Sequence, residues 1–281
     1  MQLDNSLDRP RRFPGSRTIV QTMALIVALM VAPIAASETE EARTLAQQVH
    51  ERPEGDDAIT VGRMTLQETD GRERVRETVE YRLDQQDGSR LSMIRFLDPG
   101  DIRDTGLLMH EHPDGSSDQW LYLPAADTTR RIASGRRGGR FVGSDLYFED
   151  LEDRNPALDR HRLKGESEYE GTPTTTMESV PRDSNESVYD KRVSWIHEET
   201  MIPLRIDFFE DSDEPTKRWE VERIERIQGY WTIMSSTITD LRSGHTTTLA
   251  VDDVHYDQGL PEDLFSTRML ADPERESTHR P

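Results

Sequence analysis

The sequence predicts a mainly β protein of the α+β class, in which one large, strongly curved antiparallel sheet carries one or two helices. Three features of the 281-residue chain support this prediction. Apolar and polar residues alternate with a period of two in many short segments. Asp-Gly and other glycine-containing turns separate those segments, and short turns join neighbouring strands in antiparallel fashion. Only one segment, near the N-terminus, has helical spacing, so the alternation of helices and strands that a parallel sheet requires is missing.

The N-terminal segment, residues 1–36, is typical of a secretory signal peptide. Arg9, Arg11, Arg12 and Arg17 form a basic region before an apolar stretch over residues 18–36, which ends in small residues. The uninterrupted apolar centre is about 10 residues long, and a membrane-spanning helix needs about 20. The pattern therefore favours a cleaved signal peptide over a transmembrane anchor, and it predicts export across the inner membrane.

The first element of the predicted mature chain is a helix. Residues 37–40, Ser-Glu-Thr-Glu, match a capping box, in which side chains satisfy the free backbone N–H groups at a helix start. Pro53 and Gly55 end the helix. Four apolar residues follow the box at spacings of three and four and therefore share one helical face: Ala42, Leu45, Ala46 and Val49.

After this helix the chain takes on the period of β-strands. On the first strand, Val79 and Tyr81 alternate with charged residues. We expect one domain over residues 37–270, because no fixed-period repeat divides the chain, and a disordered polar tail over residues 271–281. The expected strands lie near residues 75–83, 91–97, 107–111, 119–123, 128–132, 161–169, 174–180, 191–196, 204–209, 217–227, 231–241 and 246–256.

Large, flexible or aromatic side chains recur on the predicted strands. They predict either an ordinary core or a partly open apolar cavity covered by the N-terminal helix. The apolar content of 33% favours the cavity, because an open half-barrel needs fewer filling residues than a sandwich. Methionine adapts to apolar ligands of varied shape. The candidate lining residues are Met64, Leu66, Val79, Tyr81, Met93, Phe96, Leu107, Met109, Trp120 and Tyr122.

Composition and motifs argue against several classes of function. The chain has no cysteine, which excludes disulfides, Cys-ligated metals and a thiol nucleophile, and its net charge of −20 opposes nucleic acid binding. Neither a phosphate-binding glycine loop nor a Gly-x-Ser-x-Gly motif occurs. His110 and His112 would share one strand face, but no third metal ligand is identifiable. We therefore expect no enzymatic activity, no cofactor and no metal.

Five arginines are concentrated within eleven residues that contain no acid: Arg130, Arg131, Arg136, Arg137 and Arg140. Glycines between them make the loop flexible. One interpretation is a solvated loop that neutralises nearby carboxylates. The other is a contact surface for anionic lipid headgroups or for an acidic partner.

Several motifs together resemble the outer-membrane lipoprotein-sorting family, the LolA-like carriers. One example is Phe-Leu-Asp-Pro-Gly-Asp at residues 96–101, and another is Gly-Leu-Pro-Glu-Asp-Leu-Phe at residues 259–265. The resemblance spans about residues 60–270. Its motifs lie at residues 95–106, 118–124, 130–132, 141–151, 189–196, 203–209, 229–232, 243–247 and 259–265.

This resemblance implies an unclosed half-barrel whose open side is covered by helices. It also implies a monomeric periplasmic carrier that binds acyl chains of a lipid or lipoprotein and moves them between the inner and outer membranes, in association with an inner-membrane transporter of the RND/MMPL type. The alternative is a periplasmic module that senses lipid or lipoprotein, or assists envelope assembly. The free energy of transfer favours the carrier. An acyl chain that crosses water needs a protein to shield it, because each methylene removed from water is worth about 0.8 kcal/mol.

Overall fold

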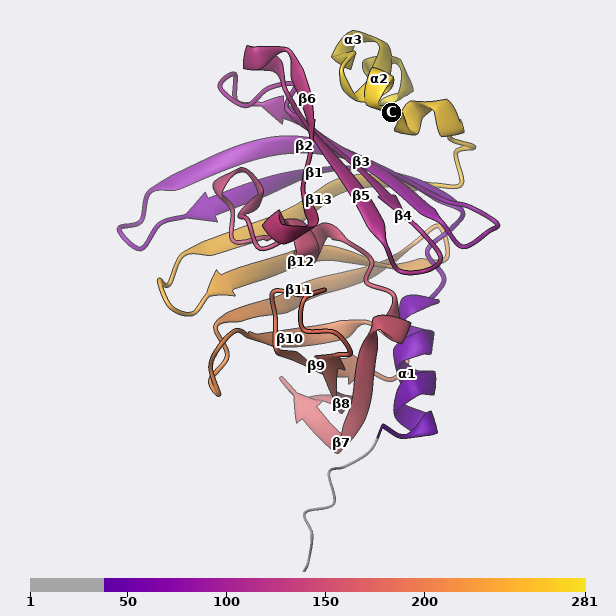
Figure 1. Cartoon of the computed structure of the whole chain (residues 1–281), viewed down its shortest axis with the longest axis vertical. Helices are drawn as coiled ribbons and strands as arrows, with labels where there is room; N and C mark the ends of the chain where they lie inside the picture. Colours follow the sequence, from indigo (N-terminus) through magenta and orange to yellow (C-terminus); the bar gives the residue numbers. More distant parts are fainter. Residues whose placement is uncertain (1–37) are drawn as a thin grey trace, which may run out of the picture. The chain divides into compact units, whose positions relative to one another are not determined.

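The computed structural model describes residues 38–281, and the predicted signal peptide lies outside these residues. The described chain contains a single 13-stranded antiparallel sheet (Figure 1). Its strand order is β6-β5-β4-β3-β2-β1-β13-β12-β11-β10-β9-β8-β7, so β6 and β7 are its edges and the sheet is not closed into a barrel. The predicted fold class, a mainly β half-barrel, is confirmed.

Nearly all strands occur where the period-two pattern predicts them. Their bounds are β1 Asp57–Gln67, β2 Glu73–Asp84, β3 Arg90–Asp98, β4 Gly106–Glu111, β5 Ser117–Leu123, β6 Thr128–Arg131, β7 Asp159–Tyr169, β8 Thr172–Pro181, β9 Lys191–His197, β10 Pro203–Phe209, β11 Lys217–Ile227, β12 Tyr230–Asp240 and β13 Thr246–Tyr256.

The strand that the sequence pattern did not predict is β1, which joins the two halves of the sheet by pairing with β2 and β13. Its alternation is interrupted at Gly62, where a bulge shifts the register with β13. A Cβ atom at Gly62 would lie 2.5 Å from the backbone oxygen of Ala250, so only glycine allows the two strands to approach this closely.

The predicted N-terminal helix is α1, Glu40–His50. Its cap is Thr39, whose hydroxyl accepts a hydrogen bond from the backbone N–H of Ala42 at 3.2 Å, so the predicted capping box starts two residues too early. On its buried face Ala46 packs with Met177 of β8 and Ile196 of β9. The helix therefore lies over the β7–β9 end of the sheet (Figure 1).

Residues 133–158, which lie between β6 and β7, cross one face of the sheet (Figure 1), and we call them the strap. It contains the short 3-10 helices η2 Ser134–Arg136, η3 Phe141–Gly143, η4 Phe148–Leu151 and η5 Pro156–Leu158, and a further one, η1 Pro124–Ala126, precedes β6. Phe141, Leu146 and Phe148 pack against Leu66 and Phe96 of the sheet. We call the sheet face that carries the strap and α1 the inner face.

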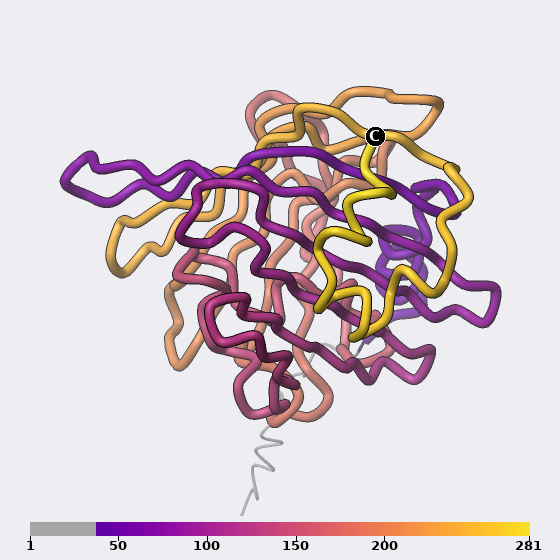
Figure 2. The backbone as a smooth tube through the Cα atoms, turned by 90° about the horizontal axis from the view of Figure 1, so that it is seen from above, coloured from indigo at the N-terminus to yellow at the C-terminus, as the bar shows by residue number. Residues whose placement is uncertain are grey.

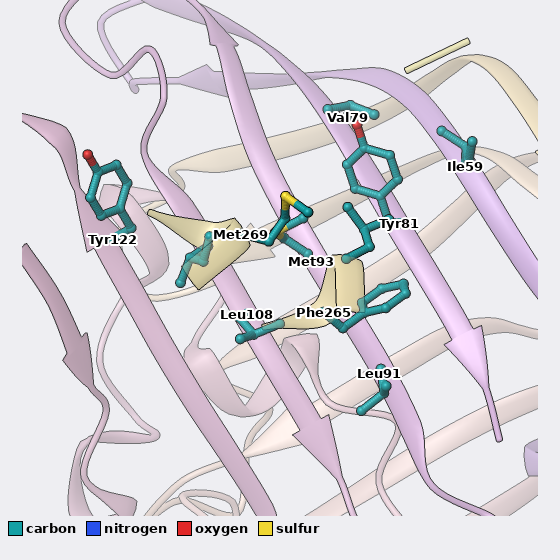
Figure 3. Close-up of a cluster of buried hydrophobic side chains, with 11 residues drawn as sticks. Ile59, Val79, Tyr81, Leu91, Met93, Leu108, Tyr122, Phe265 and Met269 are labelled. Carbon is teal, nitrogen blue, oxygen red and sulfur yellow. The ribbon is translucent and has the colours of Figure 1, made fainter. Parts of the chain in front are cut away.

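The opposite, outer face is covered by the C-terminal segment, which lies across β2–β4 (Figure 2). This segment comprises η6 Glu262–Phe265, α2 Thr267–Leu270, α3 Pro273–Glu276 and η7 Ser277–His279. Phe265 and Met269 meet Tyr81, Met93 and Leu108 in one buried cluster (Figure 3). None of the helices in the described part of the chain is long and apolar enough to cross a membrane.

The segment 271–281 is folded, in contrast to the disordered tail that its polar composition predicted. Glu276 is fully buried, as is Arg95 of β3, whose Nε donates a hydrogen bond to the Glu276 carboxylate at 3.1 Å. Tyr81 also donates to this carboxylate, and Arg280 donates to it at 2.8 Å. These buried contacts hold the tail on the sheet, and no local sequence pattern reveals them.

Candidate binding cavity

The ten candidate lining residues divide between the two faces of the sheet. Met64, Leu66, Phe96, Leu107 and Met109 lie on the inner face beneath the strap, whereas the other five lie on the outer face with the C-terminal segment. The reason is the pleat, because side chains three residues apart on one strand point to opposite sides. The residues on the outer face are Val79, Tyr81, Met93, Trp120 and Tyr122.

An apolar cavity of about 390 Å³ lies on the inner face, along the other half of the sheet. Its floor includes Ile206 of β10, Trp219 of β11 and Ile238 of β12, which are neighbours in the strand register. Its cover consists of α1 and residues 146–156 of the strap. The volume falls within the range of about 300–1,000 Å³ that is usual for small-molecule sites.

Small side chains explain why this half of the inner face is hollow. The floor row continues from Ile206 to Ser194 of β9 and then to Met177 of β8, and Ser179 also lines the cavity. A serine leaves volume that a leucine or phenylalanine would fill. None of the ten predicted residues lines this cavity. Alternation on the strand 204–209 and the apolar residues of 141–151 were the available sequence signals for it.

Buried ionic contacts hold the strap over the cavity. Lys217 of β11 donates to Asp150 of the strap at 2.7 Å, and Tyr189 donates to the same carboxylate at 2.6 Å. The Lys217 ammonium also lies 3.2 Å from the centre of the Tyr147 ring. Burial lowers the pKa of Lys217, against the opposing effect of Asp150. The cation is therefore stabilised by the strap, and the strap is positioned by the cation.

A second anchor centres on Glu149 of the strap, whose side chain is 1% exposed. Its carboxylate accepts hydrogen bonds from Arg192 of β9, from the Ser187 hydroxyl at 2.6 Å and from the Val188 backbone N–H at 2.8 Å. Each lysine and arginine that lines the cavity pairs with a described carboxylate, as does His50, whereas His161 bonds to the Ser179 hydroxyl and the Pro156 carbonyl. The pairs are His50–Asp153, Arg52–Glu54, Arg154–Asp159, Arg192–Glu149 and Lys217–Asp150.

A polar pocket of about 170 Å³ adjoins the cavity at the C-terminal end of α1, and the two share His50, Glu152, Asp153 and Arg154. His50 lies 3.2 Å from Asp153, and the hydrogen bond between them raises the pKa of His50. Arg90 of β3 also pairs with Asp153 at 2.9 Å. The cavity thus combines an apolar floor with one polar end.

Glu111 of β4 is buried beside this polar pocket. Burial raises its pKa to about 8, and the negative charge of Asp153 acts in the same direction. Its carboxylate accepts a hydrogen bond from the backbone N–H of Asp153. At neutral pH Glu111 is therefore largely protonated, which reduces the negative charge at the polar end.

The five clustered arginines have different environments. Arg137 donates to Ser117 of β5 at 3.1 Å, and Arg140 pairs with Asp240 of β12, so these two fasten the strap to the sheet. Within the strap they also pair with Glu152 and Asp145, respectively. Arg131 pairs with Asp118 but stays 66% exposed. Arg130 and Arg136 are exposed and form no ion pair with any residue that the structure describes.

His110 and His112 do not form a shared site. His110 donates from Nε2 to the Phe265 carbonyl at 2.8 Å, whereas His112 lies 3.3 Å from Asp118. Within residues 38–281 no group of three or more His, Asp or Glu side chains is placed to hold a metal ion.

Comparisons with known proteins identify a matching family model and solved structures of the same fold. Residues 88–272 match a family model described as "Uncharacterized protein". A comparison with curated proteins gives no significant match. An outer membrane lipoprotein-sorting protein domain from Vibrio parahaemolyticus is similar to this chain, with 28% identity, a TM-score of 0.78, and coverage of 83% of this chain and 99% of that chain.

Two further solved structures share the fold. A DUF1329 family protein from Desulfovibrio piger has 26% identity and a TM-score of 0.78, with 83% of this chain and 99% of that chain covered. A LolA superfamily protein from Nitrosomonas europaea has 17% identity and a TM-score of 0.64, with 81% and 98% covered. The family model covers more than half of the chain, so the chain belongs to that family, and its unclosed sheet with a covered inner face is the fold of the LolA-like proteins that it resembles.

Proposed function

We propose that the protein is a periplasmic carrier that binds an acyl chain of a lipid or lipoprotein and moves it between the inner and outer membranes. The observation that carries this proposal is the apolar cavity of about 390 Å³ on the inner face, covered by α1 and the strap. The similar domain from Vibrio parahaemolyticus is described as a lipoprotein-sorting protein, which supports such cargo for this chain.

The energetics of transfer require such a cavity. Each methylene exposed to water costs about 0.8 kcal/mol, so a 16-carbon chain amounts to about 12 kcal/mol. Burial against Ile206, Trp219 and Ile238 recovers much of this free energy. Release follows when α1 or the strap moves away, because the bound chain then regains contact with water.

The proposed activity requires no covalent step. Directionality would come from a partner at each membrane. We propose that the donor is an inner-membrane transporter of the RND/MMPL type and that the carrier itself is a monomer. Arg130 and Arg136, which are exposed at the strap end of β6, are suited to contact anionic headgroups at either membrane. Arg131 is paired with Asp118 but is still 66% exposed, so it can contribute to this surface. Arg137 and Arg140 are paired with Glu152 and Asp145 of the strap and are not free to contribute.

A transfer assay tests the carrier function. Donor vesicles containing a fluorescent acyl lipid are mixed with unlabelled acceptor vesicles, and the rate of label movement is measured with and without the protein. Ile206→Trp fills part of the cavity and should strongly reduce the acceleration for a lipid with a 16-carbon chain. Val75→Trp adds the same side chain at a position that is 47% exposed and away from the cavity, so it should leave transfer intact.

Native mass spectrometry of the protein purified from its host provides the second measurement. Co-purified lipid together with transfer supports the carrier. Bound lipid without any transfer would instead favour the sensing or assembly module. If the wild-type protein neither retains lipid nor accelerates transfer, the proposed function is wrong.

A further inference from the structure

The inner face of the sheet has one half that the strap fills and one half that stays hollow. On the half formed by β1, β3 and β4, the strap side chains Phe141 and Phe148 fill the space against the sheet, and Leu146 lies at the border with the cavity. On the half formed by β8–β13, about 390 Å³ remains empty. The strap thus occupies apolar floor that would otherwise be available to a ligand.

The volume of the hollow half sets the size of its occupant. An apolar cavity of about 150 Å³ accommodates benzene, which has six carbon atoms. On that scale 390 Å³ accommodates about 16 carbon atoms, the size of one ordinary acyl chain. Two such chains would need about twice this space.

We propose that the cargo is a single-chain amphiphile, bound as one acyl chain per protein, and that the strap excludes a second chain by occupying its place. This inference rests on the proposed carrier function and specifies its ligand class. A lipid with two chains would have to leave one of them in water. Each methylene left exposed lowers the equilibrium constant about fourfold, so the discrimination against a second long chain is large.

Buried polar contacts keep the strap in the place of that second chain. Asp145 of the strap is 1% exposed. Its carboxylate accepts hydrogen bonds from Arg140 at 2.7 Å and from Thr247 of β13 at 2.7 Å, and it lies 2.5 Å from His245. Moving Phe141 and Leu146 off the sheet would leave these groups without their partners. The half of the inner face that the strap fills, which we call the plugged half, is therefore held in place by specific buried contacts.

The head group of the probe follows from the charges around the cavity. The lysine and arginine side chains that line it are each paired with a carboxylate, and the ring nitrogens of His161 are engaged by Ser179 and the Pro156 carbonyl, so no described lysine or arginine there is free to bind an anionic head. Phosphatidylcholine and lysophosphatidylcholine carry the same zwitterionic head and differ only in the number of acyl chains. This pair isolates the effect of the second chain.

The experiment is a competition. The protein is incubated with vesicles that contain equal amounts of 16-carbon lysophosphatidylcholine and of phosphatidylcholine with two 16-carbon chains, and bound lipid is identified by native mass spectrometry. We expect one lysophosphatidylcholine per protein and at least a 100-fold preference over the two-chain lipid. Comparable binding of both lipids, or two lysophosphatidylcholine molecules per protein, would overturn the inference while leaving the carrier function intact. Binding of neither lipid would count against the carrier function itself.

Strap variants test the cause of the preference. Phe148→Ala and Phe141→Ala, separately and together, should raise the bound fraction of the two-chain lipid at least tenfold, because neither side chain lines the cavity. Leu108→Ala truncates a fully buried side chain on the outer face, so it is a control of similar severity that should keep the preference. If the strap variants fold, as judged by circular dichroism, and the preference is unchanged, the strap is not what excludes the second chain. If they do not fold, the wild-type competition alone decides the inference.

Discussion

The cavity volume makes a quantitative prediction about the length of the bound chain. Affinity for lysophosphatidylcholines should rise about fourfold per added methylene, which corresponds to about 0.8 kcal/mol each. The rise should end near 16 carbons, because a cavity of about 390 Å³ has no room for more. Longer chains would extend into water and gain nothing from the added length.

A cavity-filling variant should move this limit. Ile206→Trp introduces about six more non-hydrogen atoms into the floor, so on the same scale the limit should fall from about 16 to about 10 carbons. Val75→Trp should leave the limit unchanged, because Val75 does not line the cavity. The change in limit therefore reports on the cavity and not on added hydrophobic surface.

Competition titration against a short-chain reference lipid, below the concentration at which the lipids aggregate, measures the series. Affinity that keeps rising at the same slope beyond about 20 carbons would refute the volume argument. So would the same limit in Ile206→Trp and in the wild-type protein. An affinity that does not depend on chain length would show that the acyl chain is not buried at all.

Three further predictions concern stability and membrane contact. Glu276→Ala should lower the free energy of unfolding by about 3–5 kcal/mol, because it leaves buried Arg95 unpaired, and a urea titration showing less than about 1 kcal/mol would contradict this. Because folded Glu111 keeps its proton up to about pH 8 and the unfolded carboxyl loses it near 4.5, the free energy of unfolding should fall as pH rises between these values, by up to about 1.4 kcal/mol per pH unit. Denaturation of Glu111→Gln across this range should lack that slope. Arg130→Ser combined with Arg136→Ser should reduce sedimentation with anionic vesicles at low salt, and unchanged sedimentation would exclude these arginines as headgroup contacts.

The sheet could be predicted from the sequence because its signal is local. The strand Lys217–Ile227 was predicted with its observed bounds, since Trp219 and Val221 alternate with charged residues, further apolar residues follow, and the turn at Gly229 ends it. The strand Asp57–Gln67 was not predicted, because Gly62 and the bulge before it break the alternation that identifies a strand. Alternation also cannot say which face is inner, and this is why Met93 and Phe96 were expected to share a cavity.

The features that were not predicted depend on contacts between distant residues. Arg95 and Glu276 are 181 positions apart, and neither has a neighbour in sequence that indicates burial of an ion pair. The polar composition of residues 271–281 therefore indicated disorder, although Glu276 is fully buried. The cavity likewise arises from the absence of large side chains at Ser179 and Ser194 under the strap, and a missing side chain leaves no periodic signal.

The two ends of the strap differ in chemistry in a way that suits loading and release. Around Phe141 and Phe148 the strap is held by apolar packing in addition to the buried contacts of Asp145, and separating the apolar surfaces would expose them to water at full cost. Over the cavity it is held mainly by the ionic contacts of Glu149 and Asp150, and charges that separate regain hydration, which offsets much of the interaction they lose. Residues 149–154 can therefore lift at a lower cost than residues 141–148. Opening at the ionic end would free the bound chain while the plugged half keeps the remainder of the inner face closed.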